Sequence, residues 1–146
     1  FAGHEKVGPS QQQLGSCYCT VVRPILEYAC PVWHFSLTKH QSDCIEQIQK
    51  RALGIIYGFE LNYCDKLAIS QLDLLSTRRE ALCRKLFVDI LFNNQHCLQY
   101  LLPRKRTDIA DSVVTRSQKT LTLVLPRFRT NRFRDSFMMR CLEIFM

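Results

Sequence analysis

The chain has 146 residues, of which 47% are hydrophobic, and a formal net charge of +7 at neutral pH. This composition is typical of a globular protein and excludes a disordered tail. No apolar run approaches the roughly 18 residues that span a bilayer, so we expect no membrane association. The first residues contain no apolar targeting segment, which favours an intracellular protein. Because the chain begins at Phe1 rather than Met, we interpret it as a fragment or a processed product.

The positive charge lies in the second half of the chain. Residues 1–73 contain six Lys and Arg against seven Asp and Glu, whereas residues 74–146 contain fourteen against six. A one-sided basic excess attracts polyanions, of which nucleic acid is the commonest. A basic surface that only keeps the protein in solution is the alternative, and charge alone does not separate the two.

Eight cysteines occur in the chain, and several lie within apolar helical patterns such as ALCRKL. A free cysteine in such a pattern behaves as a small buried hydrophobic residue. A chain of this length builds a core without disulfides, and no secretory signal accompanies the cysteines. We therefore expect reduced thiols.

The first expected helix spans residues 11–28. Its apolar stripe consists of Leu14, Tyr18, Val21 and Ile25. Pro24 falls inside this pattern and removes one backbone donor, which predicts a kink rather than an end. Pro31 is expected to end the helix and to push Cys30 towards extended geometry.

The second expected helix spans residues 37–58. Thr38 and Gln41 have the spacing of a capping box, and Gly58 suits a left-handed C-cap. The predicted inward face consists of Ile45, Ile48, Ala52 and Ile55. The residues expected to lie off that face are Glu46, Gln49, Lys50 and Arg51.

Two further helices are expected before residue 95. A short one covers residues 63–71, and its predicted inward residues are Tyr63, Leu67 and Ala68. Ser76 is a candidate N-cap for a longer helix over residues 77–92. The apolar stripe of that helix is Leu82, Leu86 and Ile90, and Asn93 and Asn94 end it.

The remainder of the chain is less regular. Residues 103–120 have the composition of a polar linker, and LTLVLP at residues 121–126 predicts one short strand or hairpin. Residues 121–146 form a basic Arg/Phe segment in which Ser136 caps a short terminal helix. We expect a mainly α protein: a separate N-terminal stretch at residues 1–13, a small helical bundle at residues 14–102, the linker, and a partly irregular basic end.

The chain lacks the signs of an enzyme or a metal site. A metal-dependent polymerase or nuclease needs clustered carboxylates, and Asp108 and Asp111, the nearest pairing, fit a solvated turn in the linker better. A zinc site requires a second ligand pair that Cys30 and His34 do not have. We therefore expect no catalytic residue, no metal and no cofactor in this chain.

Cysteine–histidine nucleophiles are the other catalytic alternative. Cys30 with His34 and Cys97 with His96 are neighbours in sequence, an arrangement that seldom forms a dyad, and nothing nearby indicates an oxyanion hole. The chain contains no Gly-rich phosphate loop either.

Basic residues are the candidate binding residues. On helix flanks these are Lys50, Arg51, Arg78, Arg79, Arg84 and Lys85, and in the C-terminal segment they are Arg127, Arg129, Arg132 and Arg134. We expect these side chains to contact phosphate. The interleaved Phe128, Phe133 and Phe137 suit either base stacking or, as we favour, anchoring of the chain end in the core.

Several long motifs resemble one family in order along the chain. They are RPILEYACPVWH, the SLT turn, IQKRAL, LSTRREALCRKLF, LLP with a basic cluster, and PRFRTNRFRDSF. These stretches resemble the region that follows the polymerase palm in non-LTR (LINE-type) retrotransposon reverse transcriptases of the jockey-like and chicken-repeat-like group. The resemblance covers about residue 14 to the end, with departures at Gly54 and Met139.

The resemblance implies a helical thumb and C-terminal region of an RNA-directed DNA polymerase. Such a region would grip an RNA–DNA or RNA template-primer behind a palm domain that this chain does not contain. The alternative is a non-catalytic helical protein-interaction module or an inert relic of a mobile element.

The stretch from Arg23 to His34 is expected to be architectural rather than chemical. Glu27 has the i,i+4 spacing for a pair with Arg23, or it caps a neighbouring donor. Trp33 is expected to pack in the corner against the following helix, and His34 to act as a hydrogen-bonding residue there.

Overall fold

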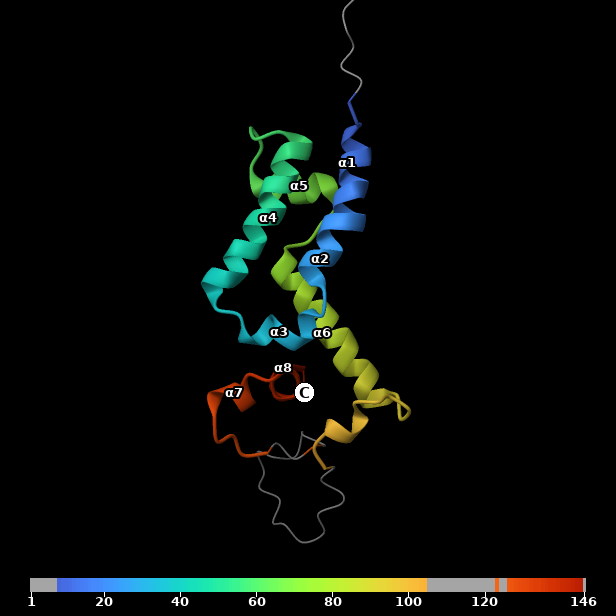
Figure 1. Ribbon diagram of the computed structural model, residues 1–146, viewed down its shortest axis with the longest axis vertical. Helices are drawn as coiled ribbons and strands as arrows, with labels where there is room; N and C mark the ends of the chain where they lie inside the picture. The colour runs from blue at the N-terminus through green and yellow to red at the C-terminus, as the bar shows by residue number, and fades with distance from the viewer. Residues whose placement is uncertain (1–7, 105–122, 124–125, 146) are drawn as a thin grey trace, which may run out of the picture. The chain divides into compact units, whose positions relative to one another are not determined.

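The computed structural model describes residues 8–104, 123 and 126–145, and this part of the chain is mainly helical, as predicted. Figure 1 shows helices joined by loops, with no strand among the described residues. Within the same residues, no helix is both long enough and apolar enough to cross a bilayer.

The described residues form two compact units that interleave along the chain. The first unit takes residues 8–29 and 37–79, and the second takes residues 30–36 and the described residues from 80 onward. Each unit has its own apolar cluster. The domain boundaries expected from composition stay a prediction, and most of the expected linker, residues 105–120, lies outside the described residues.

The first unit begins with a continuous helical stretch in three parts. These are α1 (Gln11–Cys17), a π-helical turn η1 (Tyr18–Val22) and α2 (Arg23–Glu27). Ser10 and Gln13 form a capping box at the start of α1. The prediction that Pro24 does not end the helix is confirmed. The irregularity takes the form of the π turn directly before Pro24, where the Arg23 N–H donates to the Tyr18 carbonyl five residues back.

Backbone geometry at Tyr28 and Ala29, not Pro31, ends this helical stretch. Tyr28 has a ψ of 126°, and Ala29 has a φ of 49°, in the left-handed region. Pro31 lies in the first turn of the next helix, α3 (Cys30–Trp33), where its missing N–H has no helical partner to lose. The predictions that Pro31 stops the helix and that Cys30 is extended are therefore wrong.

Helix α4 (Lys39–Tyr57) has the predicted ends. Thr38 accepts a hydrogen bond from the Gln41 N–H, and the Gln41 side chain bonds back to the Thr38 N–H. Gly58 follows the helix with a φ of 89° and a ψ of 161°. The positive φ is as predicted, but this ψ is not that of a left-handed C-cap. It belongs to an extended region that essentially only glycine adopts.

The predicted inward face of α4 is wrong by about one residue. Ile48 and Ile55 are 46% and 63% exposed, whereas the buried residues are Gln49, Leu53, Gly54 and Ile56. One residue rotates a helix face by about 100°. The error arose because Gln49 was taken for a surface residue, although its amide is satisfied inside the unit.

Helix α5 (Tyr63–Ser70) packs against α4, and its apolar face is only partly as predicted. Tyr63 and Leu67 join the apolar cluster, but Ala68 is exposed. Lys66 is buried instead.

Helix α6 (Leu75–Phe92) begins before the predicted cap, because Ser76 lies inside its first turn. The Leu75 N–H donates to both carboxylate oxygens of Glu46, at 3.3 and 3.0 Å. A carboxylate from α4 therefore caps this helix, where a serine from its own sequence was predicted. The residues buried along the helix are Leu75, Arg79, Cys83, Phe87 and Ile90. The predicted stripe was correct at Ile90 only, since Leu82 and Leu86 are half-buried.

A polar network around Gln49 lies at the centre of the first unit. The buried Tyr18 hydroxyl donates to the Gln49 Oε1 at 2.6 Å. The Gln49 Nε2 donates to the Tyr63 hydroxyl oxygen and to the Asp73 carbonyl, each at 3.0 Å. The Tyr63 hydroxyl in turn donates to Glu46. One amide thus joins the π turn, α5 and the segment that leads into α6.

The second unit contains the remaining described elements. They are α3, η2 (His34–Ser36), most of α6, η3 (Gln99–Leu101), α7 (Asn131–Arg134) and α8 (Phe137–Phe145). Helix α8 begins directly after Ser136, as predicted, and α7, capped by Thr130, was not predicted. Of the expected strand at residues 121–125, Leu123 is described and is buried in the core; the others lie outside the described residues.

Three cysteines are part of the core of the second unit. Cys30, Cys83 and Cys141 are buried, and all eight cysteines are free thiols, as predicted. Burial raises the pKa of the Cys83 and Cys141 thiols to about 12, so both stay protonated near neutral pH. They serve as small hydrophobic residues.

Replacing Gln49 with leucine tests the polar network. Gln49→Leu keeps the side-chain volume but leaves the buried Tyr18 hydroxyl and the Asp73 carbonyl without this partner. We expect the free energy of unfolding to fall by about 2–4 kcal/mol, measured by urea denaturation. The matched control is Gln47→Leu on the exposed side of the same helix, with an expected change within about 0.5 kcal/mol. Equal effects of the two substitutions would contradict the role assigned to Gln49.

Candidate functional site

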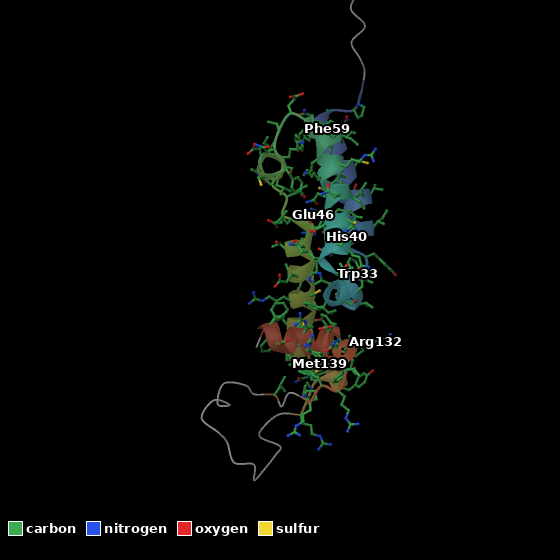
Figure 2. The ribbon with its side chains drawn as sticks, turned by 90° about the vertical axis from the view of Figure 1, so that its left-hand side faces the viewer. Trp33, His40, Glu46, Phe59, Arg132 and Met139 are labelled. Carbon is green, nitrogen blue, oxygen red and sulfur yellow. The ribbon has the colours of Figure 1, made fainter. Side chains whose placement is uncertain are left out.

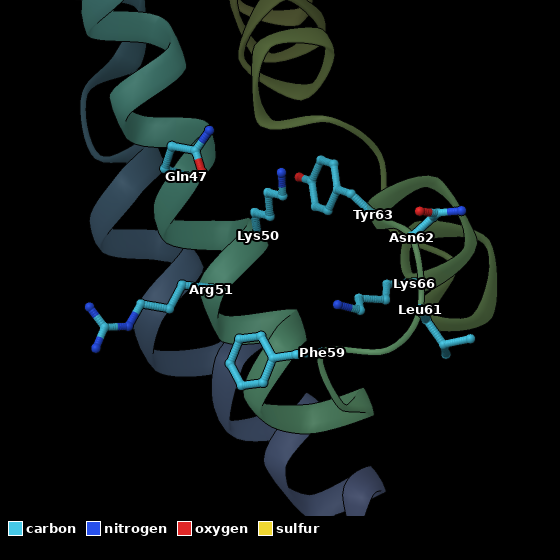
Figure 3. Close-up of a pocket in the computed structure, with 8 residues that line it drawn as sticks. All are labelled: Gln47, Lys50, Arg51, Phe59, Leu61, Asn62, Tyr63 and Lys66. Atoms are coloured by element: carbon cyan, nitrogen blue, oxygen red, sulfur yellow. The ribbon is translucent and has the colours of Figure 1, made fainter.

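A pocket of about 350 Å³ opens between the C-terminal half of α4, the loop that follows it and the start of α5. Figure 3 shows its eight lining residues, which are Gln47, Lys50, Arg51, Phe59, Leu61, Asn62, Tyr63 and Lys66. No acidic side chain is among them. The pocket lies wholly within the first unit.

Three cations surround the pocket. Lys50 and Arg51 are exposed on α4, and Lys66 comes from α5. In Figure 3 the Lys50 amino group points towards the Tyr63 hydroxyl, whereas the Arg51 guanidinium extends to the other side of α4. Among the described residues, none of the three forms an ion pair with a carboxylate. Their charge is therefore available to an anionic ligand.

Lys66 is 4% exposed, which is unusual for a lysine. Its Nζ lies 5.7 Å from the centroid of the Phe59 ring. This cation–π contact partly offsets the desolvation of the ammonium group. The result is a cation held in a fixed place at the edge of the pocket.

Phe59 follows Gly58 and turns back over α4. A Cβ atom added at Gly54 would lie 2.5 Å from the Phe59 Cε1, so the ring can rest on the helix only because residue 54 has no side chain. The ring is nevertheless 73% exposed. Figure 2 shows Phe59 past the end of α4, with Glu46 near the middle of that helix.

Tyr63 connects the pocket to the polar network. Its hydroxyl accepts from Gln49 and donates to Glu46. Burial, and then the hydrogen bond to Glu46, raises the pKa of Tyr63, so the hydroxyl stays protonated and continues to donate. Burial likewise raises the pKa of Tyr18, although the nearby Arg23 opposes this shift. Both ends of the network therefore remain neutral donors.

The helix-flank cations predicted to contact phosphate belong to both units. Lys50 and Arg51 line one pocket, and Arg84 and Lys85 are exposed on α6. Arg84 also lies 5.6 Å from the centroid of the Phe145 ring.

Two predicted binding arginines have structural partners. The Arg78 Nε lies 2.5 Å from the Glu27 Oε1, and Arg23 lies 3.9 Å from the same oxygen. The predicted Arg23–Glu27 pair is thus confirmed, with Arg78 as a closer partner. Arg79 is 0% exposed and donates to the Ser42 hydroxyl at 2.9 Å. A guanidinium with no exposed surface does not meet a phosphate from solvent, so the prediction for Arg79 is wrong.

The C-terminal arginines form a second basic region. Arg127, Arg129, Arg132 and Arg134 are all exposed, and Figure 2 shows Arg132 on α7. Among the interleaved aromatics, Phe128 and Phe133 are 40% and 44% exposed with ring centroids 6.2 Å apart, whereas Phe137 packs into the core. The expectation of core anchoring is confirmed for Phe137.

The remaining candidates from the sequence are an aspartate pair, possible metal ligands, and the residues Trp33 and His34. Asp108 and Asp111 lie outside the described residues. Within the described residues, no three His, Cys, Asp or Glu side chains lie together as metal ligands. Trp33 is half-buried at the end of α3, and its packing against the following helix stays a prediction, as does the role of His34.

Sequence reasoning missed Phe59 and Lys66. Lys66 stands in CDKLAIS directly before a leucine, where a charged residue next to an apolar one normally faces solvent. A local signal for Phe59 existed in Gly54 and Gly58, since two glycines shortly before an aromatic residue indicate close backbone approach.

Comparison with known proteins identifies no relative. No protein-family model, no curated protein and no solved structure matches the chain.

Arg79→Ala should separate a structural arginine from a surface one. The substitution removes a fully buried side chain and the donor to Ser42, so we expect the free energy of unfolding to fall by about 2–4 kcal/mol. Lys85→Ala, exposed on the same helix, should change it by less than about 0.5 kcal/mol. The measurement is urea denaturation followed by circular dichroism. A small effect of Arg79→Ala would show that Arg79 is not needed for packing.

Proposed function

We propose that this chain is a nucleic-acid-binding segment of a non-LTR reverse transcriptase, without catalytic capacity of its own. The single observation that carries the binding function is a pocket lined by an exposed aromatic ring and by Lys50, Arg51 and Lys66, none of which is paired with a carboxylate among the described residues. The parent family rests on the resemblance of the sequence motifs. The ligand we propose is an RNA–DNA or RNA template-primer.

Phosphate contact is the chemistry that these side chains support. Lysine and arginine bind phosphate oxygens and release the counterions condensed on the nucleic acid, a contribution that does not depend on sequence. We therefore propose binding with little sequence preference. The exposed C-terminal arginines, with Arg84 and Lys85, would add phosphate contacts of the same kind.

The parent polymerase would supply everything catalytic. Under this proposal the palm domain is a partner of this segment, the reaction belongs to the palm, and the segment needs no metal or cofactor of its own. This proposal implies that the protein is intracellular, because the template RNA is found there.

A second candidate function, a protein-interaction module, is favoured by one observation. The first helical stretch exposes large apolar residues, with Val21 at 55% and Ile25 at 72%. Surfaces of this kind mark protein contacts or, without a partner, drive association.

Salt dependence tests nucleic-acid binding. Three phosphate contacts on a single strand predict that log K falls with log salt with a slope of about −2, and more steeply if the C-terminal arginines take part. Lys50→Ala should flatten this slope by about 0.7. Fluorescence anisotropy with a labelled oligothymidylate between about 50 and 200 mM salt measures both quantities.

Lys39→Ala is the matched control, because Lys39 is exposed on the same helix but does not line the pocket. It should leave the slope nearly unchanged. Affinity that does not depend on salt would contradict the proposed function. Equal effects of Lys39→Ala and Lys50→Ala would remove the pocket from the binding surface.

Sedimentation velocity tests the second candidate. If the exposed apolar residues of the first helix form an interface, the purified chain should associate as its concentration rises. Val21→Ser combined with Ile25→Ser should reduce that association by removing apolar surface. A monomer at all concentrations would argue against an interaction module formed by copies of this chain.

A further inference from the structure

Phe59 is both exposed and fixed in position. Phe92 is another exposed ring, at 80%, but it is not among the residues that line this pocket. Phe59 instead rests on Gly54, lies beneath the Lys66 ammonium, and lines a pocket. A ring that is 73% exposed beside cations is the arrangement that proteins use to stack nucleobases.

The remaining lining residues can bind the rest of a nucleotide. Gln47 and Asn62 contribute amides that both donate and accept hydrogen bonds, and Lys50 and Lys66 contribute cations. The volume of about 350 Å³ is at the lower end of the range for ligand pockets, roughly 300–1,000 Å³. A pocket of this size accommodates one unit of a polymer rather than a helix.

We propose that this pocket binds an unpaired nucleotide, with its base stacked on Phe59 and its phosphate held by Lys50 and Lys66. The inference rests on the proposed function and narrows it to single-stranded nucleic acid. In a duplex each base face is covered by its neighbours, so a ring has access only at an end or an unpaired position. Ring stacking is tolerant of sequence, which agrees with binding without sequence preference.

The test compares two probes of equal length and equal phosphate number. One is an oligothymidylate, and the other is an abasic deoxyribose phosphodiester, which has the charges but no bases. The wild-type chain should bind the oligothymidylate about 5- to 150-fold more tightly, the range expected for one stacked base. Phe59→Leu, which keeps an apolar contact on Gly54, should lose this preference and bind both probes alike.

Two variants serve as controls. Phe59→Trp retains an aromatic face and should keep or increase the preference for the oligothymidylate. Phe92→Leu removes a similarly exposed ring that does not line the pocket and should leave the preference unchanged. Circular dichroism of each variant checks that the helical content is retained.

The outcomes separate this inference from the proposed function. Salt-dependent binding of both probes with equal affinity would overturn the stacking role while phosphate binding stands. A base preference that survives Phe59→Leu would also overturn it and assign stacking to another residue. Absence of salt-dependent binding to either probe would overturn the proposed function, and the stacking role with it.

Discussion

The buried amide of Gln49 is the constraint on which the first unit depends. It accepts from Tyr18, donates to Tyr63 and donates to the Asp73 carbonyl, so three separate segments are held around one side chain. Glu46, one turn earlier on α4, extends the network to the first N–H of α6. Because Tyr63 opens α5, the network also determines where Lys66 lies. The basic pocket is therefore a consequence of buried polar contacts, not of surface charge alone.

Much of the fold could be predicted from local signals. The capping box of Thr38 and Gln41 and the glycine at position 58 depend on a few neighbouring residues, and both ends of α4 follow from them. The helix faces could not be predicted as well. Apolar periodicity favoured Ile48 and Ile55 as the buried residues, but the unit buries Gln49 instead. The cost of burying this amide is offset by hydrogen-bond partners that lie 31, 14 and 24 residues away in the sequence. The prediction of Ser76 as the N-cap was wrong for the same reason, a contact distant in sequence, since Glu46 caps α6 from another helix.

The candidate site could be predicted only in part. Lys50 and Arg51 were identified as exposed cations of a helix flank, and both line the pocket. Arg79 was identified on equal grounds, yet it is buried, because its place on α6 turns it inward towards Ser42. Lys66 was missed because its burial depends on the Phe59 ring, a contact between separate elements. The types of the residues indicated which chemical groups the site contains. Which group each charged side chain contacts depends on tertiary packing and could not be predicted.

Ultraviolet crosslinking to an oligothymidylate, followed by peptide mapping, is the most direct test of where nucleic acid lies on this chain. Aromatic side chains stacked on a base are the ones placed to react. Our account predicts a crosslink in the peptide that contains Phe59 and Tyr63, and its loss in Phe59→Leu. Crosslinks confined to the peptide that contains Phe128 and Phe133 would contradict the account and move the binding site to the C-terminal arginines.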